Sequence, residues 1–226
     1  MEAPFTAREL FAMAARYNAY IEPLQILIYI PTLLIFILLR RGTKQDTSRG
    51  VMLLLAAEWA MVGVLFFFIV MGDVHWVGYV AGGVCIATAL YFAVSASLAF
   101  PPHFHWRADN PTLLSLLVVA FGVLGYPGLS WILGRQYPAV TTYGLMPGSV
   151  ALLTLGVALS ARPAPRLWMM APALFFMLIS VATILWWKVW EDYALLPAAV
   201  LGMWAWKRWH RKNLEAPTKD TIRFDF

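Results

Sequence analysis

The chain has 226 residues, of which 61% are hydrophobic and only 13% are charged, whereas about a quarter of the residues in a soluble domain are charged. So large an apolar fraction excludes an ordinary water-soluble core and indicates a membrane protein. The net charge of +5 does not indicate nucleic acid, because the basic residues lie in short connectors and in the tail rather than in a stripe with exposed aromatic residues. The lipid bilayer is therefore the first expected partner, and no nucleic-acid partner is expected.

Residues 1–19 are predicted to form a short helix that lies in the outer membrane interface. Thr6 and Glu9 have the spacing of a capping box, which specifies where a helix begins. Apolar residues from Leu10 to Tyr17 fall on one side of this helix, as in an interfacial amphipathic helix. The charged residues of the segment interrupt any apolar stretch long enough for a cleavable signal peptide.

Residues 20–208 are predicted to form an all-α, polytopic bundle of seven transmembrane helices, followed by a polar cytoplasmic tail over residues 209–226. A helix needs about 20 apolar residues to cross a hydrocarbon layer of roughly 30 Å. The last segment is the shortest and contains Pro197. The predicted spans are residues 20–40, 51–71, 75–99, 112–133, 141–160, 168–187 and 193–208.

The distribution of basic residues predicts the orientation of these spans, because Lys and Arg gather in cytoplasmic loops. An outside N-terminus places thirteen basic residues in the cytoplasm and four outside, so we expect a bacterial inner-membrane protein with a cytoplasmic C-terminus. The predicted cytoplasmic residues are Arg40, Arg41, Lys44, Arg49, Arg107, Arg162, Arg166, Lys207, Arg208, Arg211, Lys212, Lys219 and Arg223. The predicted outer residues are Arg8, Arg16, Arg135 and Lys188.

Glu58 is the leading candidate for a functional residue. It lies in the second predicted span, roughly 10 Å inside its cytoplasmic edge at the helical rise of 1.5 Å per residue. An ionised carboxylate at that depth costs several kcal/mol, so Glu58 must find a partner in the bundle or stay protonated. It is either a neutral hydrogen-bonding residue between helices or a residue that handles a proton or ligand. Trp59, beside it, is a tryptophan well inside a span.

Glu22 and Asp192 are candidates for an outward-facing polar site. Glu22 lies near the outer end of the first predicted span, and Asp192 lies at the outer start of the last. Solvated carboxylates at helix ends are common, and that remains the alternative.

Proline and glycine mark two further candidate regions, in the outer parts of the fourth and fifth predicted spans. Tyr126 and Pro127 stand in the stretch Gly-Tyr-Pro-Gly, and Met146, Pro147 and Ser149 stand in the stretch Gly-Leu-Met-Pro-Gly-Ser. Broken helices of this kind line binding sites in transporters. Proline is also common in packed membrane helices, so a packing role is the alternative.

Motifs for cofactors and catalysis are not found in the sequence. It contains no Gly-rich phosphate loop, HExxH motif or nucleophile elbow. His103 and His105 have no cysteine or further histidine nearby to complete a metal site. A retinal Schiff base would need a lysine in the middle of the last span, where there is none. We therefore assign no catalytic residue, no metal site and no cofactor.

Several short motifs resemble a family of bacterial membrane proteins, domain of unknown function 6064. The residues that carry the resemblance are Pro4-Phe5-Thr6, Tyr17-Asn18-Ala19, Pro23-Leu24-Gln25, Glu58-Trp59, Gly63, Gly125-Tyr126-Pro127, Tyr137-Pro138-Ala139, Thr142-Tyr143-Gly144, Asp192-Tyr193 and Leu195-Leu196. The resemblance implies the same membrane architecture and no particular activity. One motif departs from the family pattern, in which a Pro-Cys-Pro element is followed by threonines. This chain has Met146-Pro147-Gly148-Ser149 there, which leaves a thioether as the only soft ligand, so metal handling does not carry over from relatives.

Three functions remain open on the sequence. The first is a small-solute or ion transporter with Glu58 as its buried protonatable group, which predicts a polar cavity reaching inward. The second is a non-catalytic accessory subunit of a membrane complex or a homo-oligomer, which predicts a smooth apolar face without a cavity. The third is an integral membrane enzyme of the polyprenyl cyclase type with Glu58 as the acid, which predicts a cavity open to lipid. The transporter is the preferred interpretation.

Overall fold

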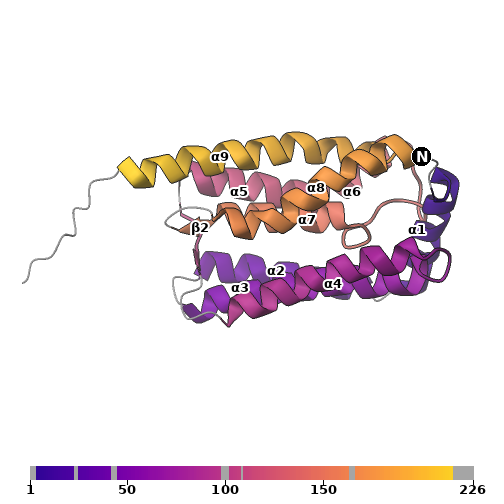
Figure 1. Cartoon of the computed structure of the whole chain (residues 1–226), viewed down its shortest axis with the longest axis horizontal. Helices are drawn as coiled ribbons and strands as arrows, with labels where there is room; N and C mark the ends of the chain where they lie inside the picture. The colour runs from indigo at the N-terminus through magenta and orange to yellow at the C-terminus, as the bar shows by residue number, and fades with distance from the viewer. Residues whose placement is uncertain are drawn as a thin grey trace, which may run out of the picture.

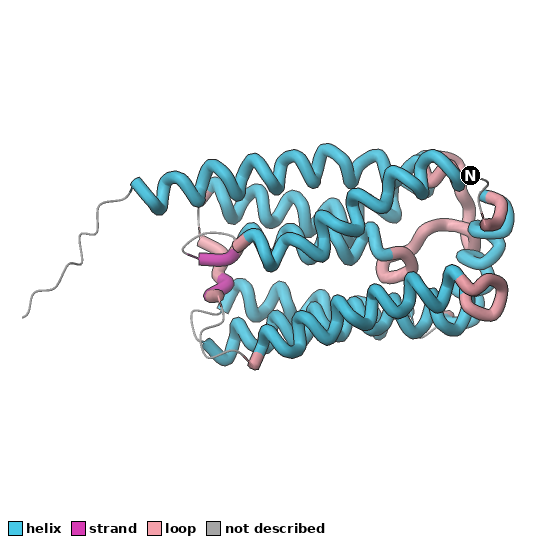
Figure 2. The backbone as a smooth tube through the Cα atoms, viewed as in Figure 1, coloured by secondary structure: helices cyan, strands magenta, loops and turns pink. Residues whose placement is uncertain are grey.

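A computed structural model describes residues 4–22, 25–41, 45–97, 102–107, 109–162 and 166–215. Within these ranges the protein is all-α apart from one pair of two-residue strands (Figures 1 and 2). The elements are α1 Ala7–Ile21, α2 Gln25–Arg41, α3 Gln45–Met61, the π-helix η1 Val62–Met71, α4 Val77–Ala96, β1 His103–Phe104, α5 Asn110–Ala120, the π-helix η2 Phe121–Gly125, α6 Tyr126–Ile132, α7 Pro147–Leu159, β2 Ala161–Arg162, α8 Leu167–Trp187, the 3-10 helix η3 Trp190–Ala194 and α9 Leu195–Glu215.

Each of the seven predicted apolar segments contains a helix, but the helices differ in how well they suit a bilayer. Among the described residues four stretches are long and apolar enough to cross a membrane, at Gln45–Met71, Val77–Ala96, Asn110–Ile132 and Leu167–Trp187. A fifth is obtained if α1 and α2, which meet at a bend of 86°, form one broken span. The apolar helix α7 has 13 residues, and the second half of α9 is strongly basic.

The helices form two groups that lie side by side. The first group contains α2, α3, η1 and α4, and the second contains α5 to α9, as Figure 1 shows. Within the groups, α3 packs on α2 and α4, and α7 packs on α5 and α8. The main helix-to-helix contact between the groups is that of α3 with α7. We call the surface along which they meet the seam.

The two ends of the bundle are closed differently. At one end α1 lies across the helices and contacts both η1 and α8 (Figure 1). Its capping box is present as predicted, with Thr6 accepting a hydrogen bond from the amide of Glu9 and Glu9 accepting one from the amide of Thr6. At the other end β1 pairs with β2, so that His103 lies opposite Arg162. We call these the α1 end and the basic end.

The predicted alternation of loops agrees with the positions of the described residues. The amide of Trp106 donates to the carbonyl of Leu39 at 3.0 Å, and the amide of Phe104 donates to Ser48 Oγ at 3.2 Å. These bonds bring the connectors after α2, α4 and α7 to one end, where the predicted cytoplasmic arginines gather. Lys44, Lys219 and Arg223 lie outside the described residues.

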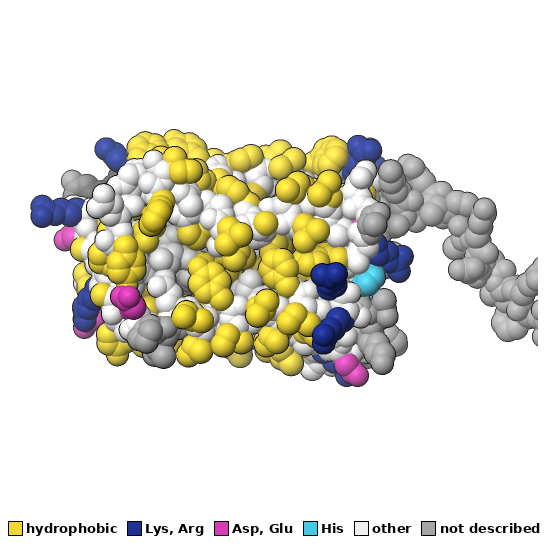
Figure 3. All heavy atoms as spheres, turned by 180° about the vertical axis from the view of Figure 1, so that it is seen from behind, with side chains coloured by type: hydrophobic (Ala, Val, Ile, Leu, Met, Phe, Trp, Pro, Cys, Tyr) yellow, Lys and Arg dark blue, Asp and Glu magenta, His cyan; other side chains and the backbone are white. Residues whose placement is uncertain are grey.

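The surface between the two ends is apolar. Figure 3 shows hydrophobic side chains over the middle of one face and charged side chains near the ends. Large side chains are widely exposed there, for example Leu124 and Leu178, each 70% exposed. A soluble monomer rarely exposes a continuous apolar surface of this extent. The apolar helices and this surface together indicate a membrane protein.

One detail of the predicted spans is wrong. The helix in the fifth segment begins at Pro147 and not at residue 141. Pro147 stands in the first turn of α7 after the extended Met146, where an amide has no helical partner in any case, so it starts this helix rather than breaks it. Pro127 lies inside the continuous stretch Asn110–Ile132, directly after η2. Pro197 lies in the first turn of α9, which follows η3 directly. Pro31 and Pro172 lie inside α2 and α8.

Candidate functional site

Glu58 lies at the seam, fully buried on α3. Its Oε1 accepts a hydrogen bond of 2.5 Å from Thr32 Oγ1 on α2. Thr32 Oγ1 also lies 2.7 Å from the hydroxyl of Tyr143. Because the single Thr32 proton goes to Glu58, the Tyr143 hydroxyl is the donor in this second bond. Glu58 thus ends a short chain of hydroxyls that joins α2 to the loop between α6 and α7.

The second oxygen of Glu58 has no partner. Oε2 is buried and makes no hydrogen bond to the described residues, and the buried hydroxyl of Tyr17 on α1 is also unpartnered. A buried polar atom without a partner costs about 1–3 kcal/mol. Glu58 Oε2 and the Tyr17 hydroxyl therefore each keep an unused capacity for a hydrogen bond in the core.

Trp59 joins the two helix groups across the seam. Its Nε1 donates to Thr154 Oγ1 on α7 at 3.0 Å, and its ring lies 4.5 Å from that of Phe176 on α8. The side chain is fully buried. These contacts make Trp59 part of the packing between the groups.

The loop between α6 and α7 reaches inward between the two groups from the α1 end (Figure 2). Asn18 on α1 holds it, donating to the carbonyls of Pro138 at 2.6 Å and Val140 at 2.8 Å. The Tyr137 hydroxyl donates to Glu22 Oε2 at 2.5 Å, and this hydrogen bond raises the pKa of the Tyr137 phenol. Glu22 is exposed at this end.

Gly144 and Ser149 shape the last turn of this loop. Gly144 has φ +75°, and a Cβ there would lie 2.5 Å from Ile28 Cγ2. Its amide donates to Ser149 Oγ at 3.2 Å. This tight turn places Tyr143 next to Thr32 on one side of the loop and Met146 on the other. The predicted irregular backbone is therefore present here, as loop rather than as kinked helix.

Asp192 lies in η3, between α8 and α9 at the α1 end. It is 4% exposed, and both its oxygens are used. Oδ1 accepts from the Tyr126 hydroxyl and Oδ2 from Thr183 Oγ1. Burial raises the pKa of the Asp192 carboxyl to about 6, against the lowering effect of these two hydroxyls. Asp192 is thus a partnered internal group and not a solvated helix cap.

The neighbouring Glu191 pairs with Arg135 and accepts from Thr141 Oγ1 at 3.1 Å. The Arg135 guanidinium also lies 3.7 Å from the centre of the Phe11 ring on α1. These contacts tie η3, the loop after α6 and α1 together. The polar groups at this end hold α1 against the rest of the bundle.

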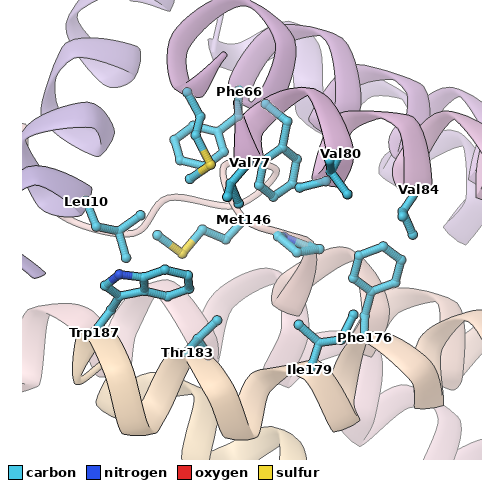
Figure 4. Close-up of a pocket in the computed structure, with 14 residues that line it drawn as sticks. Leu10, Phe66, Val77, Val80, Val84, Met146, Phe176, Ile179, Thr183 and Trp187 are labelled. Atoms are coloured by element: carbon cyan, nitrogen blue, oxygen red, sulfur yellow. The ribbon is translucent and has the colours of Figure 1, made fainter. Parts of the chain in front are cut away.

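A cavity of about 240 Å³ lies between α4 and α8, close to the α1 end. Figure 4 shows side chains from both helix groups around it, with Met146 and Trp187 on the side of α1. No polar atom is exposed on its wall. It reaches the surface, because Val80 and Ile179 line it and are 55% and 40% exposed. Its wall includes Phe66, Val80, Val84, Met146, Ile179 and Trp187.

The predicted site residues thus fall into separate places. Tyr126 meets Asp192, and Met146 and Pro147 line the cavity. Glu58 is hydrogen-bonded to Thr32 instead, and it does not line the cavity between α4 and α8 or either of two further cavities along α2. Pro127 starts α6, and Ser149 supports the turn at Gly144. Among the described residues, no three His, Cys, Asp or Glu lie together as a metal site would need.

Comparison with known proteins identifies the family of this chain. Residues 7–216 match a protein family described as a family of unknown function, DUF6064. The chain belongs to this family. The match covers nearly all of the chain and confirms the family resemblance of its motifs. No curated protein and no solved structure matches the DUF6064 chain.

The motifs that carry the DUF6064 resemblance meet in the structure around the α1 end and the seam. Asn18 holds Pro138, Tyr126 meets Asp192, and Tyr143 joins Glu58 through Thr32. Each pair is far apart in the sequence. The motifs therefore mark three separate tertiary contacts between distant parts of the chain.

Proposed function

We propose that this DUF6064 protein is a seven-span protein of a bacterial inner membrane that binds, and in its full activity transports, a lipid-soluble small molecule. The seven predicted segments each contain a helix, and short or bent helices such as α7 are shielded by neighbours in the bundle. The excess of arginine at the basic end supports a cytoplasmic C-terminus and an outside α1.

The observation that carries the proposal is the cavity between α4 and α8. Its wall is apolar throughout and open at the membrane-facing surface. Its volume of about 240 Å³ is just below the roughly 300–1,000 Å³ of typical small-molecule sites. It therefore suits a compact apolar molecule or one branch of a larger lipid, which would enter sideways from the bilayer.

The three hypotheses from the sequence make different demands on this region. A carrier of hydrated ions needs polar groups around its path, and Met146, Phe66 and their neighbours offer none. A cyclase needs an acid in its cavity, but the single hydroxyl side chain among the lining residues is that of Thr183, and it already donates to Asp192. An accessory subunit needs no cavity at all. A lipid-soluble ligand fits the cavity best.

Glu58 is proposed as the protonatable group that responds to the ligand. It lies at the seam between the two helix groups, whose separation a ligand in the cavity would change. Tyr17, whose hydroxyl is unpartnered, packs edge-on against Phe66 at 5.8 Å, and Phe66 lines the cavity. A movement of Phe66 would therefore be transmitted to the buried polar groups through a single side chain, that of Tyr17.

Photolabelling tests the cavity. The full chain in lipid nanodiscs is treated with a diazirine-bearing decane, and labelled residues are mapped by mass spectrometry. We expect labelling of Met146 in the wild type. The variant Ala81→Trp fills the cavity, because Ala81 lines it, and should reduce that labelling at least 5-fold.

Ala87→Trp is the matched control, since Ala87 lies on the same helix, is exposed and does not line the cavity. It should leave the labelling of Met146 unchanged. Labelling of Met146 that is equally strong in Ala81→Trp, or no stronger than nonspecific labelling of Leu90 on the exposed face of α4, would refute the proposal.

A further inference from the structure

A second groove lies on the seam, between α2 and α5, and it has a charged end. Its apolar part, of about 320 Å³, is lined by Ile30, Leu33 and Phe36 of α2 with Val123 of η2. Phe36 also lines the adjoining part, of about 520 Å³, which includes Arg40, Trp106, Arg107 and Leu116. The two parts therefore adjoin at Phe36 and follow one another along α2 toward the basic end.

The two arginines of this groove have no acidic partner among the described residues. Two acids of the basic end whose side chains are described have other partners, since Asp46 pairs with Arg49 and Asp109 pairs with Arg162. Although partial burial opposes it, the Thr112 amide and the Arg162 guanidinium hold the pKa of Asp109 below its ordinary value. Arg40 and Arg107 are both exposed and leave an uncompensated positive charge at the end of an apolar groove.

The segment that carries Arg107 is fixed in place. The amide of Trp106 donates to the carbonyl of Leu39, and its indole Nε1 donates to Ser115 Oγ, each at 3.0 Å. Its ring packs edge-on against Phe36 at 5.2 Å. The amide of Arg107 donates to Thr112 Oγ1 at 2.9 Å. The backbone of Arg107 is therefore held beside α2 before any ligand binds.

The length of the groove fits a lipid. Arg40 and Ile30 are ten residues apart on α2, or about 15 Å, which is one half of a hydrocarbon layer of roughly 30 Å. Guanidinium groups recognise phosphate oxygens, and tryptophan prefers the level of the headgroups. Basic pockets between transmembrane helices on the cytoplasmic side bind anionic lipid headgroups.

We infer that the groove between α2 and α5 is a binding site for one anionic phospholipid of the inner leaflet, with its phosphate between Arg40 and Arg107 and an acyl chain along Phe36, Leu33 and Ile30. This inference depends on the membrane orientation proposed above and is independent of the cavity between α4 and α8. The bound lipid fills the seam on the face opposite that cavity and stabilises the approach of the two helix groups.

Native mass spectrometry of the full, delipidated chain in a non-ionic detergent tests the inference. Dioleoyl phosphatidylglycerol is compared with dioleoyl phosphatidylcholine, which has the same chains and no net charge, and with glycerol phosphate, which has no chains. We expect the anionic lipid to bind at least 10-fold more tightly than either. Equal binding of the two lipids, or equal binding of glycerol phosphate, would overturn the inference.

Two pairs of variants locate the site. Arg40→Gln with Arg107→Gln should weaken binding of the anionic lipid about 10-fold, whereas Arg208→Gln with Arg211→Gln, two exposed arginines of α9 at the same end, should not. Leu116→Trp obstructs the groove with its charges intact and should also weaken binding. Leu117→Trp, on the exposed face of the same helix, is its control. The same loss in a variant and its control would show nonspecific binding.

The photolabelling and lipid-binding experiments can fail separately. Ala81→Trp leaves the groove between α2 and α5 untouched, and the arginine variants leave the cavity between α4 and α8 untouched. Loss of lipid selectivity with intact labelling of Met146 would therefore concern the groove alone.

Discussion

Glu58 and Asp192 are both buried acids, yet they differ in how many of their carboxylate oxygens accept hydrogen bonds. Asp192 has a hydroxyl donor on each oxygen, from Tyr126 and Thr183. Glu58 has a donor on Oε1 and nothing on Oε2. A fully partnered buried acid holds its neighbours in place, whereas one with a free oxygen has capacity for another group. The comparison assigns a structural role to Asp192 and leaves Glu58 available for function. Glu191, whose Oε1 pairs with Arg135, also keeps a free Oε2.

Replacement of Asp192 should have the largest effect on stability. Asp192→Ala leaves the buried Tyr126 hydroxyl without its acceptor, which costs about 1–3 kcal/mol, and removes one of the two acceptors of the half-buried Thr183 hydroxyl. We expect a loss of about 3 kcal/mol in the free energy of unfolding, measured by denaturant titration in detergent micelles. Asp192→Asn keeps one acceptor oxygen and should lose clearly less. If Asp192→Ala were as stable as the wild type, the proposed structural role of Asp192 would be refuted.

Gly144→Ala should have an intermediate effect, because it disturbs the turn that presents Tyr143 to Thr32 and Glu58. The left-handed backbone at φ +75° and the approach of Ile28 together cost about 2 kcal/mol. Thermal unfolding followed by size-exclusion chromatography measures this loss. Gly128→Ala is the control, since a Cβ at Gly128, within α6, meets no atom within 4 Å. An equal shift in both variants would show that the turn does not matter.

Glu58→Gln should have the smallest effect on stability and the clearest one on activity. Glutamine can accept the Thr32 hydrogen bond in the same place, so we expect less than about 1 kcal/mol of change in unfolding free energy. Once a ligand is identified, its uptake into proteoliposomes should lose its dependence on pH in this variant. If Glu58→Gln lost as much stability as Asp192→Ala, Glu58 would be a structural acid like Asp192, and the contrast between the two residues would be refuted.

The sequence predicts the helices and singles out Glu58, because one carboxylate in an apolar run is conspicuous on its own. It does not predict that Thr32 and Tyr143 are its partners, since they are 26 and 111 residues away in the chain. Tyr126 and Asp192 were both candidates, but their pairing depends on how α6 packs on η3. Side-chain partners in a helical bundle follow from tertiary packing, and a single sequence carries little information about it.

Two site features were missed although signals for them exist. The start of α7 at Pro147 is marked by a proline in the first helical position, a common helix start, which hydropathy averaged over the segment conceals. Asn18 is a polar residue on the apolar face of an otherwise amphipathic helix, spaced one turn from Ala14, and this position indicates a buried partner. The lateral cavity has a signal only at Met146 and Pro147, because its other lining residues are mostly ordinary apolar ones, and the lining comes from five elements.

The ties at both ends of the bundle limit how the seam can widen. Trp187 Nε1 donates to the carbonyl of Phe5 at 2.8 Å and its ring stacks on Phe5, which fastens the segment before α1 to the second helix group. At the opposite end β1 is paired with β2. A ligand that enters the proposed cavity sideways would therefore have to bend the helices apart between these two fixed ends. The π-helical segments η1 and η2 are the places where these helices would bend.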